Sequence, residues 1–123
     1  MTMTLPYAGA LGLEVEADGI VRMPFSERLI GRTNFLHGGA ISGLLEVAAL
    51  VALQHALGAE RPRIKPVNVT VDFLRGGATV LTFAQGTITR LGGRAVNAEA
   101  RAWQNDPARP IATARLNYLL ERS

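Results

Sequence analysis

The sequence predicts an α+β domain in which a curved antiparallel β-sheet wraps around one long central helix. Two observations carry this prediction. Residues 40–57 are almost all apolar and helix-forming, and a helix that is apolar on every side must be covered on every side. Most of the remaining chain has the alternating pattern and the turn residues of β-strands. With 123 residues, the chain has the length of a single domain, residues 1–123.

A β-hairpin is predicted ahead of the helix. Residues 13–17 and 20–23 have strand composition, and Asp18-Gly19 between them is typical of a two-residue hairpin turn, because both residues tolerate positive φ. Residues 24–36 are turn-prone and lack a regular period, which indicates an irregular loop. The helix is then expected over residues 40–57, with Gly58 as a plausible C-cap.

Four strands are predicted after the helix, as an antiparallel meander. They cover residues 67–73, 79–89, 94–104 and 111–120, and Gly76-Gly77 and Gly92-Gly93 are expected turns. The alternation assigns one face of each of the last two strands to the core, and small residues there would let a helix approach closely. These core faces are Val96, Ala98, Ala100 and Ala102, and then Ala112, Ala114, Leu116 and Tyr118.

The composition excludes several kinds of site. The chain has no cysteine, so disulfides, thiolate metal sites and a cysteine nucleophile are ruled out, and with two histidines we expect no metal. The net charge of +3 comes from scattered arginines, not a basic stripe, so we expect no nucleic-acid partner. No unbroken apolar run of bilayer length and no secretory signal is visible, so we expect no membrane partner and a cytoplasmic location.

Glu46 is the most informative residue for function. It lies in the middle of the apolar helix, where a buried carboxylate is costly unless it is paired, neutralised or hydrated. Helical spacing places Gly39, Ser42 and Gly43 on the same stripe, and such small residues leave room for a ligand. Either this carboxylate acts on a substrate, or it pairs with an arginine across a subunit contact.

A second candidate feature is His37-Gly38-Gly39 at the predicted start of the helix. Unpaired N–H groups there favour an oxyanion or a polarised carbonyl, although a simple turn with a structural His37 would have the same sequence. Gly38 and Glu46 are eight residues apart, or about 12 Å along one helix, so they cannot touch the same carbonyl. We therefore expect two copies of the chain to build each site.

These residues resemble a known family. His37-Gly38-Gly39, with Glu46 nine positions after the histidine, is similar to the signature of hotdog-fold acyl-CoA thioesterases, in particular the PaaI-like and 4-hydroxybenzoyl-CoA thioesterase branch. The segment 69–75 also resembles the strand that follows the helix in this family. The resemblance implies a hotdog fold, a homodimer or homotetramer, an acyl-CoA substrate and no cofactor other than the coenzyme A of the substrate.

The resemblance also implies roles for individual residues. It makes Glu46 the nucleophile or general base, the Gly38 N–H the donor to the thioester oxygen, and His37 a residue that shapes the loop. Many relatives have Asn or Gln where Gly31 stands, and Asn34 is the candidate for that polar role here. Relatives of this type can carry a hydroxyl residue where Leu50 stands.

Coenzyme A contacts are expected from arginines and glycines at strand ends, because guanidinium groups bind phosphate well. An ordinary hairpin whose arginines are solvated would have the same sequence pattern. The candidate substrate-binding residues are Gly39, Ser42, Arg75, Arg90, Gly92, Gly93 and Arg94. Plausible acyl-lining residues are Tyr7, Phe35, Leu36 and Phe73, whereas we expect Trp103 and Tyr118 to be packing residues.

The sequence thus predicts an acyl-CoA thioesterase that releases a free acid and CoA from an aryl- or short- to medium-chain acyl-CoA. Two alternatives share the fold: a non-catalytic acyl-CoA-binding hotdog protein, and a hotdog dehydratase or hydratase. The loss of a polar residue at Gly31 permits the first alternative. The second usually needs a catalytic histidine with a carboxylate.

Overall fold

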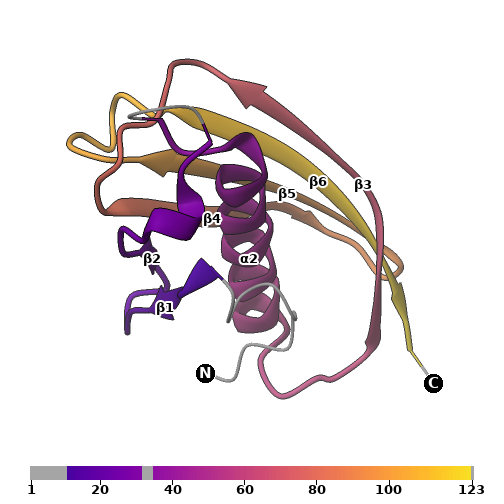
Figure 1. Ribbon diagram of the computed structural model, residues 1–123. Coiled ribbons are helices and arrows are strands. Elements are labelled where there is room, and N and C mark those ends of the chain that lie inside the picture. Colours follow the sequence, from indigo (N-terminus) through magenta and orange to yellow (C-terminus); the bar gives the residue numbers. More distant parts are fainter. Residues whose placement is uncertain (1–10, 32–34, 123) are drawn as a thin grey trace.

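The computed structural model describes residues 11–31 and 35–122 and has the predicted α+β architecture. A helix, α2 (Gly38–Leu57), lies along the concave face of a six-stranded antiparallel sheet (Figure 1). The sheet is built from β1 (Glu14–Val15), β2 (Val21–Met23), β3 (Arg63–Phe73), β4 (Thr82–Leu91), β5 (Ala95–Trp103) and β6 (Ala112–Glu121). A 3₁₀ helix, η1 (Glu27–Leu29), interrupts the loop before α2.

The strand order corrects one expectation. The strands run β1-β2-β4-β5-β6-β3, so β4, β5 and β6 form a meander but β3 lies at the far edge, beside β6. The other edge of β4 is already paired with β2, for instance at Val21 and Ala84, so β3 cannot be its neighbour. Gly76-Gly77 therefore belongs to a connection that crosses one end of the sheet. Turn residues mark a connection, but they do not determine which strand pairs with which.

The first hairpin differs from its prediction in the length of its turn. The Gly19 N–H donates to the Glu16 carbonyl at 2.9 Å, and the Glu16 N–H donates to the Ile20 carbonyl at 2.8 Å. The turn therefore contains Ala17, Asp18 and Gly19, three residues instead of two. Gly19 has φ +89°, the single positive φ that a three-residue hairpin turn requires.

The predicted core faces of β5 and β6 are confirmed. Ala98, Ala100 and Ala114 are almost completely buried against α2, as are the other members of both faces. The helix also passes very close to β4, because a Cβ atom at Gly86 would overlap the carbonyl oxygen of Ala48. Small residues on the sheet thus set the distance at which α2 packs.

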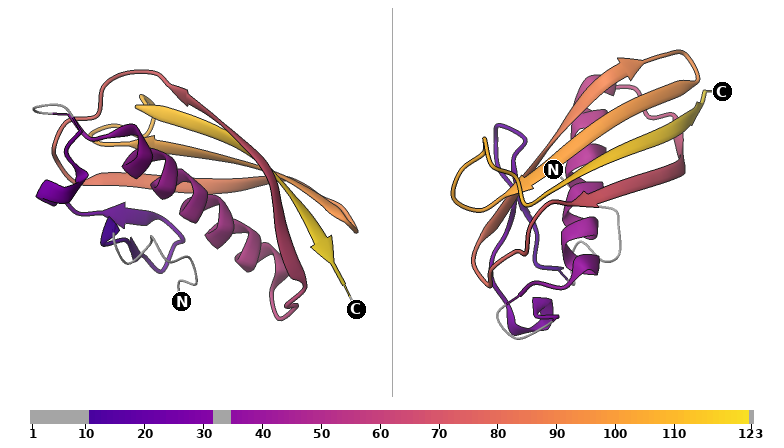
Figure 2. Two further views of the ribbon diagram at one scale, coloured as in Figure 1. Left: turned by 45° about the vertical axis from the view of Figure 1, so that its right-hand side comes forward. Right: turned by 90° about the horizontal axis from the view of Figure 1, so that it is seen from above.

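One stripe of α2 is left incompletely covered. Although α2 is long and apolar enough to cross a membrane by length and composition alone, most of it is buried within this fold (Figure 2). The exceptions include Ser42, Glu46, Leu50 and Gln54, four residues at successive helical turns that are half-buried. The sheet of one chain therefore does not wrap the helix on all sides.

Candidate active site

The site begins where α2 begins. His37 is the N-cap, with φ −74° and ψ 150°, and its Nδ1 accepts a hydrogen bond from the Ala40 N–H at 2.9 Å. This cap starts the helix at Gly38, two residues before the predicted start. The N–H groups of Gly38 and Gly39 are in the first turn, where no carbonyl within the helix can accept them. They are positioned to donate to an oxygen of a bound molecule.

A cleft of about 550 Å³ opens beside this helix start. Three of the four predicted acyl-lining residues, Phe35, Leu36 and Phe73, line it together with His37 and Gly38. The fourth, Tyr7, lies outside the described residues, as does the predicted catalytic Asn34. Arg75, one of the predicted substrate-binding residues, also lines the cleft. The remaining lining residues are Gly31, Ile41, Leu74, Gly76 and Gly77.

A second cavity, the Glu46 cavity, lies further along α2 and measures about 530 Å³. Glu46 is half-buried and faces this space, so its carboxylate adjoins room for a ligand. The lining is mostly apolar, which suits an acyl group better than a phosphate. It comprises Glu46, Leu50 and Gln54 of α2, Ile64, Pro66, Val67, Asn68 and Val69 of β3, and Leu116 and Tyr118 of β6.

The two cavities have no described lining residue in common. Gly38 and Glu46 both lie on α2, so the rise of the helix separates them by about 12 Å. The predicted residues Gly39 and Ser42 lie on the stripe of α2 between them and are absent from the described lining of both cavities. One chain therefore carries the predicted donor and the predicted carboxylate in two separate places.

The other predicted substrate-binding residues lie far from Arg75. Arg90 lies near the end of β4, and Gly92, Gly93 and Arg94 form the β4–β5 turn that follows. This turn lies at the end of the sheet where α2 ends, whereas Arg75 lies at the end where α2 begins. The structure thus separates the predicted phosphate-binding residues into two groups.

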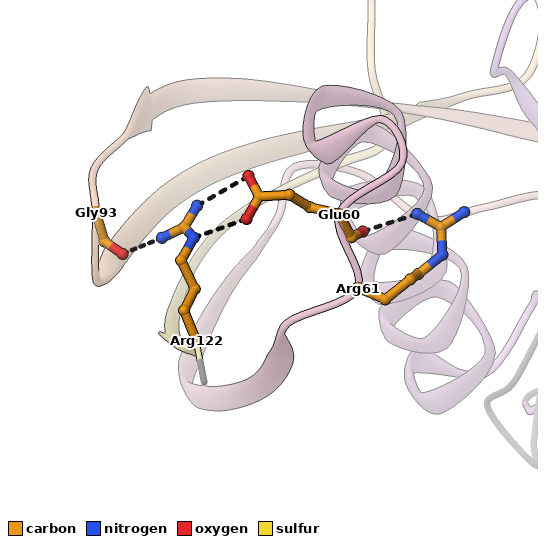
Figure 3. Close-up of polar contacts among 4 residues, drawn as sticks. All are labelled: Glu60, Arg61, Gly93 and Arg122. Atoms are coloured by element: carbon orange, nitrogen blue, oxygen red, sulfur yellow. Dashed lines mark hydrogen bonds and ion pairs between the residues drawn. The ribbon is translucent and has the colours of Figure 1, made fainter.

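The β4–β5 turn is held by a polar cluster (Figure 3). Arg122 donates from Nε to Glu60 Oε2 at 2.8 Å and from Nη2 to Oε1 at 3.4 Å, and its Nη1 donates to the Gly93 carbonyl. The hydrogen bond from Arg122 lowers the pKa of the Glu60 carboxyl. Nearby, Arg61 donates to the carbonyls of Gly58 and Glu60. Since Glu60 precedes β3 and Arg122 follows β6, the cluster joins two segments to the turn.

Sequence reasoning missed three polar residues of the Glu46 cavity, namely Gln54, Asn68 and Tyr118. Tyr118 was expected to be a packing residue, but it lines the cavity, and burial together with the charge of Glu46 raises the pKa of its phenol to about 12. Gln54 lies two turns after Glu46 on the same stripe of α2, a spacing that could have identified it. Trp103, in contrast, is buried and stacks on Phe83 with ring centroids 5.9 Å apart, as expected of a packing residue.

The family of the chain follows from its sequence. Residues 33–111 match the model of the thioesterase superfamily. The chain belongs to this superfamily. The matched segment contains Gly38, Glu46 and the β4–β5 turn. No curated protein sequence matches the chain.

Solved structures agree with the hotdog fold. A protein from Chromobacterium violaceum is 33% identical, with a TM-score of 0.73 and coverage of 97% of this chain and 85% of the other. A phenylacetic acid degradation-related protein from Ralstonia eutropha is 20% identical, with a TM-score of 0.78 and coverage of 95% and 92%. A Bacillus halodurans protein solved with CoA is 17% identical, with a TM-score of 0.83 and coverage of 100% and 83%. These similarities support the hotdog fold, and the family match supports thioesterase activity in general.

Proposed function

We propose that the protein is an acyl-CoA thioesterase that hydrolyses an aryl- or short- to medium-chain acyl-CoA to the free acid and CoA. The observation that carries this proposal is the position of Glu46. It is the only Asp, Glu, Lys or Arg in the sequence of α2, and it faces a mostly apolar cavity. A carboxylate beside an acyl-sized space is the group that thioester hydrolysis needs, as nucleophile or as general base on water.

In the proposed mechanism, the donor comes from a second copy of the chain. The thioester oxygen accepts a hydrogen bond from the Gly38 N–H at the helix start, where the helix dipole stabilises the charge that develops during attack. Since Gly38 and Glu46 are about 12 Å apart on one helix, the donor and the carboxylate of one site belong to two subunits. A two-fold axis would produce two equivalent sites per dimer.

Strand β3 supports this assembly. It is the edge strand of the sheet, and its side chains are largely exposed, with Val67 57% and Val69 41% accessible. A long apolar edge strand has unpaired backbone groups that a second strand can pair with. Val67 and Val69 also line the Glu46 cavity, so a partner at this edge would lie next to the carboxylate.

We expect the phosphates of coenzyme A to bind arginines at the ends of the strands. Arg75 lies beside the helix start, and Arg90 and Arg94 flank the β4–β5 turn. Guanidinium groups bind phosphate oxygens through paired hydrogen bonds. The bound CoA in the Bacillus halodurans neighbour supports an acyl-CoA ligand for this fold.

The test is CoA release from a panel of aryl- and fatty-acyl-CoA thioesters by the wild type and by Glu46→Gln, which keeps the shape and removes the charge. We expect hydrolysis by the wild type and a loss of about a hundredfold or more in kcat in the variant. An equally active variant would refute the role of Glu46. A wild type that binds acyl-CoA and hydrolyses none would instead identify a binding protein.

A further inference from the structure

The Glu46 cavity has a polar side chain at the end away from the proposed catalytic carboxylate. Gln54 follows Glu46 by eight residues on α2, which places it about 12 Å further along the helix axis. Both residues line the cavity, as does Leu50 between them. Another wall is formed by residues of the edge strand β3, among them Ile64 and Val67. An elongated apolar group that begins at Glu46 therefore reaches Gln54 at its far end.

The side-chain amide of Gln54 is open to a bound molecule. Gln54 is half-buried, and within the described part of the chain its amide makes no hydrogen bond. Asn68 differs, because its side-chain oxygen accepts a hydrogen bond from Asn117 at 2.8 Å. A half-exposed amide without a protein partner is hydrogen-bonded to water. Its donors and its acceptor therefore become available to a ligand that displaces this water.

The composition of the lining restricts the kind of group that can bind beside Gln54. The described lining contains no Lys or Arg, so a carboxylate at the end of an acyl group would be buried there without a cation. A plain alkyl chain is also disfavoured, because it would displace water from the Gln54 amide and leave the amide unpaired. A neutral oxygen, which can accept a hydrogen bond from the amide N–H, avoids both penalties.

We propose that Gln54 determines substrate specificity by binding a neutral carbonyl or hydroxyl oxygen in the distal half of the acyl group. The hydrogen bond at the amide and the contact between the Glu46 carboxylate and the thioester carbon each take up to about 3 Å of the helical spacing. The bound oxygen therefore lies about 6–9 Å from the thioester carbon. The preferred substrate is a medium-chain acyl-CoA with an oxo or hydroxyl group at that distance. This inference rests on the function proposed above.

The kinetic test compares octanoyl-CoA with 7-oxooctanoyl-CoA, whose ketone oxygen is about 8 Å from the thioester carbon in an extended chain. We expect the kcat/KM of the wild type to be about tenfold higher for the oxo substrate. Gln54→Leu keeps most of the volume and removes the amide, so this variant should lose the preference and favour octanoyl-CoA. Gln85→Leu is the matched control and should keep the wild-type preference, because Gln85 is also half-buried but is absent from the described lining of this cavity.

Two kinetic results would overturn the inference. The first is an equal kcat/KM for the two substrates in the wild type. The second is an equal loss for both substrates in Gln54→Leu, because the amide would then contact the CoA portion that the two substrates share. Either result is compatible with hydrolysis by Glu46, so the proposed function would remain.

A second measurement does not depend on hydrolysis. Isothermal titration calorimetry with the uncleavable thioethers S-octyl-CoA and S-(7-oxooctyl)-CoA gives their Kd values for the wild type and for Gln54→Leu. We expect the oxo thioether to bind the wild type about tenfold more tightly than the octyl thioether, and Gln54→Leu to lose this difference. That result in a protein that hydrolyses no thioester would support the inference and refute the proposed function alone. Equal Kd values for the wild type would overturn the inference.

Discussion

At the scale of single residues, His37 and Gly38 have different tasks although they are adjacent. The Nδ1 atom of His37 accepts a hydrogen bond from the Ala40 N–H and thereby determines where α2 begins. Gly38, the first residue of the helix, keeps its own N–H outside the helical hydrogen-bond pattern. The histidine is therefore a structural cap, and the backbone of the glycine is the proposed donor.

Two substitutions of Gly38 can test the role of its N–H independently of the shape of the site. Proline is well tolerated at the first position of a helix and lacks the N–H, and the extended ψ of His37 suits a following proline. We expect Gly38→Pro to lower kcat for acyl-CoA about a hundredfold, the usual effect of removing one oxyanion donor. The measurement is steady-state hydrolysis, with helix content checked by circular dichroism.

The control for this variant is Gly38→Ala, which keeps the N–H. Its Cβ would lie 3.3 Å from the Phe73 ring, a contact that a small movement of this exposed side chain can relieve. Gly38→Ala should remain within a fewfold of the wild type. If the proline and alanine variants had the same activity, the N–H of Gly38 would have no part in the reaction.

At the scale of the elements, the sequence predicted those features that follow from the pattern of neighbouring residues. The alternation in β5 and β6 identified their core faces, and the all-apolar stretch identified α2. The position of β3 at the far edge depends on pairing between distant segments, which no local pattern contains. Tyr118 was missed for a related reason: its alternation with Asn117 and Leu119 marks it as a core residue whether or not a cavity adjoins it.

The packing of α2 on β4 gives a prediction at this scale. Gly86→Ala places a methyl group against the Ala48 backbone, which cannot move without displacing the helix. We expect a loss of about 1–3 kcal/mol in the free energy of unfolding, measured by urea denaturation. Gly93→Ala is the control, since a Cβ there meets nothing within 4 Å. Equal midpoints for the two variants would show that the close approach at Gly86 does not limit packing.

At the scale of the whole molecule, three features of one chain are incomplete by themselves. The stripe of α2 that contains Glu46 is only half-covered, β3 is an exposed apolar edge, and the donor and carboxylate face separate cavities. A second copy related by a two-fold axis would complete all three features. The sequence led to this arrangement through the spacing of Gly38 and Glu46 alone, because the length of a helical segment follows from its residue count.

The most direct test of a site shared between two chains is complementation between two inactive variants. Glu46→Gln and Gly38→Pro chains, refolded together in equal amounts, should form mixed dimers as half of the population. Each mixed dimer would contain one site with both groups intact, so the mixture should recover about one quarter of wild-type activity. If mixed dimers are confirmed by native mass spectrometry and activity stays at the level of the separate variants, the site is not shared between two chains.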